Sequence, residues 1–320
     1  QEEGWQSDTR PIAPIRLARH VIAKPTWIGP EYRSFGESVA ISGDEALVGD
    51  PNGDGIGRVH LYTRASDGSA WINQAAPGLE PPGGLPAGAT FGHAIELDGD
   101  LAIIGAPNYN AIDQDGFAML FHRSGGTWSN VATLNGTYAD ERFGWSVDIK
   151  ENVGEAFIAI GATRSGDDDD GQVYIWRWDE STQTATLEAT FGPNSIPKIE
   201  SAFGQSVALD IDPSGDIVLA VGNATQAEPA SPDGTTGAVD ILRRDAGTGI
   251  WAHEQTIEPG DEFSDAYSTL AFGYDVAIED GRLVVGAPLS GLYGTYSGDA
   301  LLFSVSDRQP YTWSLESYLD

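Results

Sequence analysis

The sequence predicts an all-β protein, a five-bladed β-propeller of four-stranded antiparallel blades, and two observations lead to this prediction. First, Phe-Gly precedes a short alternating apolar segment five times, with units that begin near residues 35, 91, 143, 203 and 272. Second, each segment is followed by a turn, a more apolar stretch that ends in glycine, a loop, and two further strand-like stretches. Repeats of this length with four strands each are typical of propeller blades.

The fifth unit shows the reason for each element. After Phe272-Gly273, Asp275-Val-Ala-Ile alternates as a half-buried strand does, and Glu279-Asp-Gly281 forms a tight turn. Leu283-Val-Val-Gly286 is continuously apolar, as in a strand covered on both faces, and Pro288 ends the ladder because proline has no N–H to donate. A third strand follows the next loop.

The fourth strand of most units begins at tryptophan, and a Thr/Ala-rich stretch from Thr184 to Phe191 takes its place in the third unit. This regular position favours packing between blades over sugar stacking. The four tryptophans are Trp71, Trp128, Trp251 and Trp313. No helical period is visible, which argues against a parallel α/β fold, and a β-sandwich would not repeat the same motifs at matching places.

Two segments follow from this pattern: an N-terminal arm over residues 1–34 and the propeller over residues 35–320. The arm contains one additional strand, at about residues 15–25, although the last unit already has four strands. This strand either closes the protein's own propeller, lies as a flap or fifth strand, or pairs with the edge of a neighbouring subunit. Self-association through the N- or C-terminal strand would give a filament.

The Phe-Gly and Gly-Ala-Pro motifs resemble the FG-GAP repeat of integrin α-subunit propellers and of secreted bacterial proteins. The likeness covers about residues 35–320 and is strong in units 1, 2 and 5, as in Phe272-Gly273 with Gly286-Ala-Pro288. It is degraded in units 3 and 4, where Gly-Ala-Pro becomes Gly-Ala-Thr and Gly-Asn-Ala. It implies a propeller that acts in adhesion or surface interaction and that carries calcium in the hairpin between the first two strands of a blade. The chain has five such units, whereas the better-known members have seven.

The only hairpin similar to that calcium loop is Asp210-Ile-Asp212-Pro-Ser214-Gly-Asp216, in which alternate side chains carry oxygen. Such ligands suit a hard cation, so we expect Ca²⁺ there; the alternative is a hairpin whose side chains cap their own backbone. A second candidate is Asp50-Pro-Asn52-Gly-Asp54, which opens like a calcium loop but lacks the closing glutamate.

Charge and composition restrict the partners. The formal net charge is −31, from 48 acidic and 17 basic residues, so binding to nucleic acid or anionic lipid is not expected. The sequence has no cysteine and no apolar run near the roughly 20 residues of a membrane span. Because the chain starts at Gln1 without an initiator methionine, we expect a secreted or cell-surface protein whose signal peptide has been removed.

No catalytic motif is present: the sequence lacks a Gly-x-Ser-x-Gly elbow, a His-Glu-x-x-His pair and a phosphate loop. We therefore expect a non-enzymatic extracellular propeller acting in interaction or assembly, with no catalytic residues and no cofactor other than Ca²⁺. The alternatives are a calcium-dependent binding module for a surface glycan or protein, and a glycoside hydrolase-like enzyme that uses carboxylates of the rim or central channel.

Overall fold

The computed structural model describes most of the chain from Ser34 to Leu319. The described residues are 34–74, 79–81, 85, 87–108, 115–138, 140–165, 170–192, 202–224, 237–259, 271–289, 298–306 and 311–319. The additional strand expected at about residues 15–25 lies outside them. They form twenty β-strands and one 3-10 turn, η1 (Gly53–Gly55), and none of their helices is long and apolar enough to cross a membrane.

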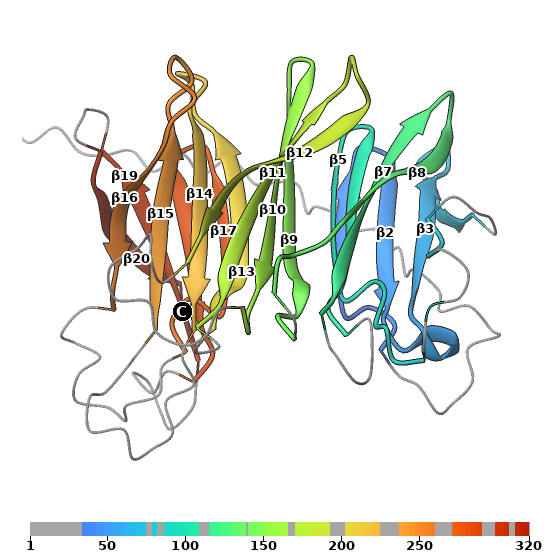
Figure 1. The fold of residues 1–320 in the computed structure, drawn as a ribbon, viewed down its shortest axis with the longest axis horizontal. Helices are drawn as coiled ribbons and strands as arrows, with labels where there is room; N and C mark the ends of the chain where they lie inside the picture. The colour runs from blue at the N-terminus through green and yellow to red at the C-terminus, as the bar shows by residue number, and fades with distance from the viewer. Residues whose placement is uncertain are drawn as a thin grey trace, which may run out of the picture.

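The strands form five four-stranded antiparallel sheets in chain order, which confirms the five-bladed propeller of four-stranded blades (Figure 1). Blade 1 has β1 (Val39–Ser42), β2 (Glu45–Asp50), β3 (Arg58–Arg64) and β4 (Trp71–Asn73); blade 2 has β5 (Ala94–Asp98), β6 (Leu101–Ala106), β7 (Phe117–Ser124) and β8 (Thr127–Leu134); blade 3 has β9 (Phe143–Asn152), β10 (Glu155–Ala162), β11 (Gln172–Asp179) and β12 (Thr184–Phe191); blade 4 has β13 (Phe203–Ile211), β14 (Ile217–Asn223), β15 (Ala238–Arg244) and β16 (Trp251–Ile257); blade 5 has β17 (Asp275–Glu279), β18 (Arg282–Ala287), β19 (Asp299–Val305) and β20 (Trp313–Leu319).

In the three middle blades the second strand is apolar along most of its length, because neighbouring blades cover both of its faces. Every residue of β6 and β14 is buried. In β14, Leu219 and Val221 pack toward blade 3, whereas Val218 and Ala220 pack toward blade 5. Three of the four tryptophans pack between blades as expected: Trp128 and Trp313 are buried in clusters that join two blades, and Trp251 packs against a third such cluster. Trp71 packs only against residues of blade 1.

The two glycines of the repeat let neighbouring blades approach at backbone distance. A Cβ on Gly105, at the end of β6, would lie 2.1 Å from the carbonyl oxygen of Gly144, the Phe-Gly glycine of the next blade. The corresponding pairs in the other blades are Gly49 with Gly92, Gly161 with Gly204, and Gly222 with Gly273. The phenylalanine beside each Phe-Gly glycine is fully buried at Phe91, Phe143, Phe203 and Phe272.

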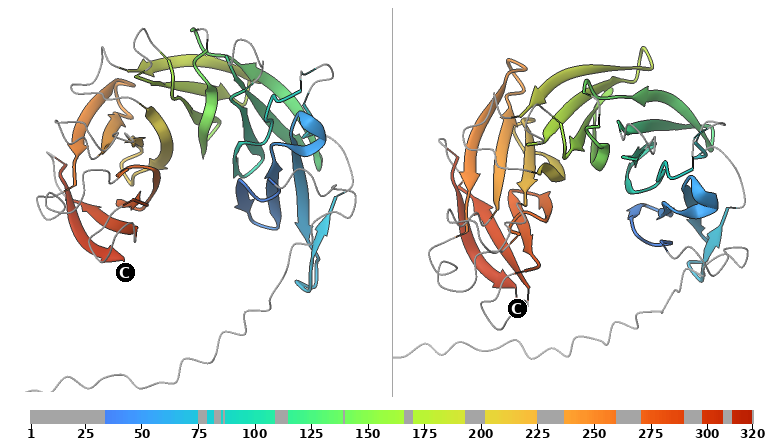
Figure 2. Two further views of the ribbon diagram at one scale, coloured as in Figure 1. Left: turned by 90° about the horizontal axis from the view of Figure 1, so that it is seen from below. Right: turned by 60° about the horizontal axis from the view of Figure 1, so that its bottom comes forward.

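The five blades follow an arc whose two ends lie apart (Figure 2). The inner strands of successive blades contact one another from β1 to β17, but the described residues of β17 make no comparable contact with β1. A parallel bridge joins each of the first four blades to the next, as Gly57 to Phe91 and Gly237 to Phe272 do, and no equivalent bridge joins the described parts of blades 5 and 1. Blades 1 and 5 therefore each present one face without a neighbouring blade.

We predict that Gly105→Ala lowers the free energy of unfolding by about 1–3 kcal/mol, because the new methyl group meets backbone that cannot move without separating two blades. Gly286→Ala is the matched control, since its Cβ would meet nothing closer than the Asp275 carbonyl at 3.5 Å. We expect it to change stability by less than about 0.5 kcal/mol in dilute solution. Denaturant titration of both variants measures the difference, and equal losses would contradict this account of the interface.

Candidate binding site in the central channel

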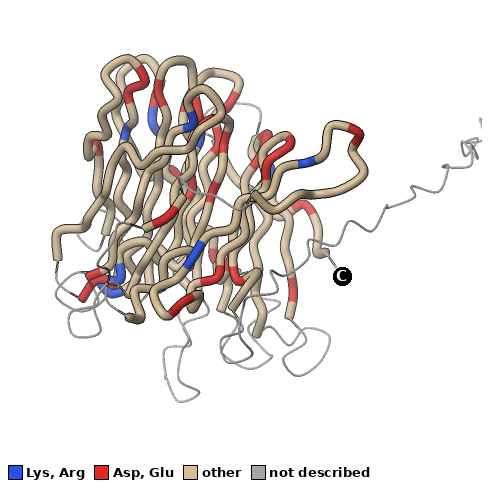
Figure 3. The backbone as a smooth tube through the Cα atoms, turned by 90° about the vertical axis from the view of Figure 1, so that its right-hand side faces the viewer, with Lys and Arg blue, Asp and Glu red and all other residues tan. Residues whose placement is uncertain are grey.

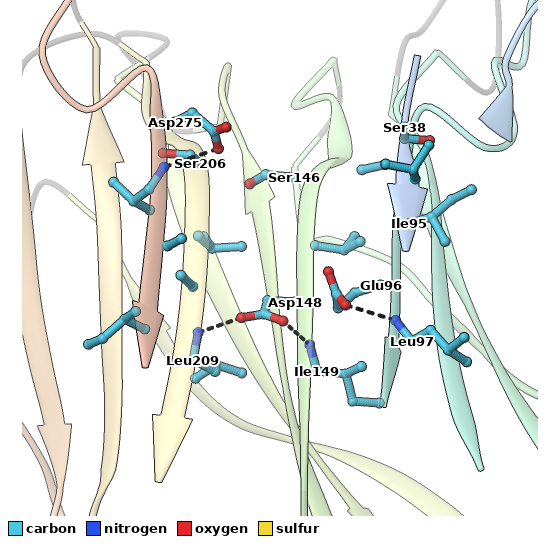
Figure 4. A pocket seen from close by; sticks show the side chains of 18 of the residues that line it. Ser38, Ile95, Glu96, Leu97, Ser146, Asp148, Ile149, Ser206, Leu209 and Asp275 are labelled. Atoms are coloured by element: carbon cyan, nitrogen blue, oxygen red, sulfur yellow. Dashed lines mark hydrogen bonds between the residues drawn. The ribbon is translucent and has the colours of Figure 1, made fainter. Parts of the chain in front are cut away.

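The inner strands of all five blades line a cavity of about 770 Å³. Its walls come from β1, β5, β9, β13 and β17 and from the residues just before these strands (Figure 4). Because the five segments are copies of one repeat, equivalent positions form successive levels along the cavity. Two of these levels carry side chains that differ between blades in chemical type, and between them lie one largely serine position and one apolar position.

The first variable level is the residue after each Phe-Gly glycine, and all five side chains line the cavity. They are Glu37, His93, Trp145, Gln205 and Tyr274. His93 Nδ1 lies 3.3 Å from Glu37 Oε1, and its ring packs on Trp145 with a centroid separation of 4.7 Å. Burial lowers the pKa of His93, with Arg142 adding to this effect against the opposing pull of Glu37. This level combines aromatic surfaces with hydrogen-bonding groups.

The next level is structural. Ser38 Oγ donates a hydrogen bond to the Gly92 carbonyl oxygen at 2.7 Å, and Ser206 does the same to Gly273 at 2.9 Å. These hydroxyls and that of Ser146 tie the inner strands of blades 1, 3 and 4 to the next blade, and blade 2 has Ala94 at this position. In blade 5 the position holds Asp275, whose carboxylate accepts the Val276 amide at 3.0 Å instead. The serine hydroxyls therefore serve to hold neighbouring blades together.

The second variable level holds two carboxyl groups, Glu96 on β5 and Asp148 on β9, which lie beside each other in the cavity (Figure 4). The same position is alanine in the other three blades, at Ala40, Ala208 and Ala277. Asp148 accepts hydrogen bonds from the Ile149 amide at 2.7 Å and from the Leu209 amide of the next blade. It thereby links β9 to β13.

Burial raises the pKa of Asp148 to about 8, and the neighbouring Glu96 carboxylate adds to the effect. Burial also raises the pKa of Glu96. Six carboxyl groups and one lysine line the cavity, in keeping with the acidic excess along the described chain (Figure 3). A channel with this balance attracts cations and admits neutral polar molecules but repels anions.

In the predicted calcium hairpin, a carboxylate forms an ion pair with an arginine. Asp212 Oδ2 contacts Arg243 Nη1 at 2.5 Å, and Asp212 Oδ1 accepts the amides of Ser214 and Asp216 at 2.8 and 3.1 Å. Asp216 Oδ1 accepts the Ala246 amide at 2.9 Å. Asp210 points instead toward Lys150, with 3.8 Å between the charged atoms. Asp212 thus caps the backbone of its own hairpin, whereas Asp210 and Asp216 contact other segments.

The side chains of the second candidate loop also contact other protein groups. Asp54 forms an ion pair with Arg58, and the Asn52 amide donates a hydrogen bond to Ser34 Oγ. Asp50 is fully buried, with its Oδ2 atom 3.9 Å from His60 Nε2. Across the part of the chain that the structure describes, no three histidine or acidic side chains cluster as metal ligands do. Calcium binding at either loop stays a prediction.

Two other buried carboxyl groups form hydrogen bonds that hold parts of the fold together. Glu141 accepts hydrogen bonds from the hydroxyls of Ser165 at 2.8 Å and Tyr174 at 2.7 Å, which holds the loop before blade 3 against that blade. Asp240 accepts from Thr256 at 2.6 Å and pairs with His253 at 2.9 Å between neighbouring strands. Neither group lines the channel, so both are assigned to the fold.

The sequence patterns did not single out Glu96, Asp148 or the level that contains Trp145. The signal was present in the aligned repeats, because carboxyl groups replace alanine only in blades 2 and 3. No known protein-family model matches the sequence. The propeller fold is therefore established by the strand arrangement without a family assignment.

The raised pKa of Asp148 makes stability depend on pH. The folded protein keeps a proton that the unfolded chain releases above its ordinary pKa of 3.8, so this contribution is complete below about pH 4 and is lost as the pH rises to about 8. We predict that the free energy of unfolding declines less steeply between pH 5 and 8 in Asp148→Asn than in the wild type. Asp44→Asn, at a surface carboxylate, should keep the wild-type slope. Identical slopes in all three proteins would contradict the prediction.

The calcium hypothesis makes a separate prediction for the wild-type protein. A cation that binds only the folded state raises the melting temperature by mass action. If either loop binds Ca²⁺, the melting temperature should rise with millimolar Ca²⁺ and fall with EGTA, and Mg²⁺ at the same ionic strength should have a smaller effect. A melting curve that responds to neither Ca²⁺ nor EGTA would dispose of calcium at both loops.

Proposed function

We propose that this protein is a secreted, non-enzymatic interaction module that binds a neutral saccharide in its central channel. The observation that carries this proposal is the variable level formed by Glu37, His93, Trp145, Gln205 and Tyr274. Five copies of one structural position present five different side chains to the same cavity. The fold does not require this diversity, because the residues on either side of the level repeat closely.

The chemistry of this level suits a polyhydroxylated ligand. The rings of Trp145 and Tyr274 offer apolar faces for the C–H surface of a sugar, and Glu37 and Gln205 offer acceptors and donors for its hydroxyl groups. A pocket with a few convergent polar groups among aromatic surfaces is the usual form of a small-molecule site. The acidic lining disfavours sulfated or uronic saccharides, which leaves neutral ones.

The extracellular assignment rests on the sequence: the absence of cysteine, the acidic surface and the resemblance to FG-GAP repeats, whose propellers act in surface interaction. We extend that resemblance to this chain as part of the proposal. Calcium dependence is not required, because the channel residues named here lie outside the two candidate loops.

A second candidate function is glycoside hydrolysis, and the pairing of Glu96 with Asp148 is the observation that favours it. Hydrolases of this kind use two carboxyl groups, one of which is kept protonated by its surroundings. We rank it below binding because both oxygens of Asp148 accept backbone amides, which assigns this side chain to the join between blades 3 and 4.

The proposal is tested by a neutral-glycan array followed by titration calorimetry with the best ligand. Tyr274→Ala removes an aromatic face from the channel, and Tyr138→Ala removes an equally exposed tyrosine that does not line it; their exposed fractions are 45% and 47%. We expect Tyr274→Ala to weaken binding about three- to tenfold and Tyr138→Ala to leave it unchanged.

Three outcomes would count against this function. Binding of no neutral glycan, or equal losses in both tyrosine variants, would contradict a saccharide site in the channel. Release of reducing ends from the bound glycan, abolished by Glu96→Gln, would replace the binding function with the hydrolase.

A further inference from the structure

Blade 1 exposes apolar residues that every other blade buries. On its inner strand, Val39 is 66% exposed and Ile41 is 64% exposed. The equivalent residues of blade 2, Ile95 and Leu97, are 5% and 3% exposed because they pack against blade 1. The same two positions are buried in blades 3 to 5, at Val147 and Ile149, Val207 and Leu209, and Val276 and Ile278. Blade 1 thus exposes the apolar surface that, in blades 2 to 5, packs against the preceding blade.

Blade 5 exposes the complementary surface, which in blade 4 packs against the following blade. In blade 4, Ala220 pairs with Ala208 and Ile241 across the sheet, and all three lie in the core between blades 4 and 5. The same register in blade 5 joins Val284 to Ala277 and Leu302. These side chains belong to no apolar cluster of the described residues, and Ala277 is exposed.

The outermost strand of blade 5 follows the same rule. In blades 2 and 4, the aliphatic residue six positions after the first tryptophan is buried by the next blade, at Leu134 with 2% exposure and Ile257 with 4%. In blade 5 this residue is Leu319, which is 47% exposed. The apolar surface is therefore present from the inner strand to the outer strand of the blade.

Blades 5 and 1 also contain the glycines that form the close backbone contact in the other interfaces, but within the molecule these glycines do not meet each other. Gly286 occupies the place of Gly105, and Gly36 that of Gly144, the two partners of a close glycine contact. A Cβ on Gly36 would meet nothing within 4 Å, and one on Gly286 would meet only Asp275 of its own sheet. Gly298 and Phe35 stand where the other blades form the parallel bridge. Both ends of the arc thus keep the residues that the four formed interfaces use.

We propose that blade 5 of one molecule packs on blade 1 of a second copy of this chain, head to tail, and repeats the interface that joins the blades within each molecule. The four internal interfaces are fixed by backbone contact, and with them in place the two ends lie apart (Figure 2). A second copy fills each end without altering any of them. Such a heterologous contact forms either a closed ring or an open filament.

This contact differs from strand donation by the N-terminal arm, because it joins two sheet faces. It is inferred without reference to a ligand, although Val39, Ile41 and Ala277 also line the channel. Because the net charge of −31 opposes association between copies, salt should strengthen the contact by screening that repulsion.

The test uses the full chain in sedimentation velocity over a range of concentrations at low and high salt. We expect oligomers whose size rises with concentration and salt. Gly286→Ala places a methyl group where the Gly36 carbonyl of the second copy must lie, and Ile41→Asp places a charge in the apolar face. Each should weaken association about tenfold or more while the melting temperature of the single molecule stays unchanged. Val153→Asp, at a residue 98% exposed on a turn of blade 3, should associate like the wild type.

Mixing the two variants gives the sharpest readout. Gly286→Ala retains an intact blade 1 face, and Ile41→Asp retains an intact blade 5 face, so the mixture should form a one-to-one dimer that grows no further. A mixture that stays monomeric would overturn the proposal, as would variants that associate as the wild type does. A wild-type protein that is monomeric under all conditions would also overturn it, because both faces would then be covered within one chain.

Discussion

The close approach of two glycine backbones between neighbouring blades is the constraint on which the rest of the structure depends. At Gly222 a Cβ would lie 2.0 Å from the Gly273 carbonyl oxygen, so the spacing between blades is set by backbone contact. At this spacing no water separates the sheets, and the second strand must be apolar on both faces. The hydroxyls of Ser38 and Ser206 then reach the next blade and donate to the carbonyl oxygens of Gly92 and Gly273.

The same constraint separates stability from recognition along each inner strand. Residues that point into the interface, such as Val147 and Ile149, are held to apolar types by close packing. Some of their neighbours, such as Trp145, line the channel and differ between blades. Asp148 also differs from its counterparts, but it accepts the Leu209 amide and so takes part in the join between blades 3 and 4. Channel positions such as Glu37, His93 and Trp145 therefore vary between blades while the interface positions stay apolar.

The sequence was sufficient for the blades because local periodicity decides them: Thr184–Phe191 was expected as a strand and is β12 over the same residues. It was not sufficient for the channel, because Glu96 and Asp148 become neighbours only when two blades are placed side by side. The ion pair between Asp212 and Arg243 could not be read from the sequence for the same reason, because Arg243 lies on a strand that follows the hairpin in the chain. Calcium binding at this hairpin stays a prediction.

The exposed faces of blades 1 and 5 have the composition of the interfaces inside the molecule, but a contact between two molecules is less favourable than a contact within one chain. Within the chain, each blade is tethered to the next, which gives a high effective concentration and makes every interface form. Between molecules the same surface must also overcome the loss of translational freedom and the repulsion of two strongly acidic chains. An interface that is permanent inside the molecule is therefore conditional outside it. Concentration and ionic strength then decide whether the arc stands alone or continues into a second copy.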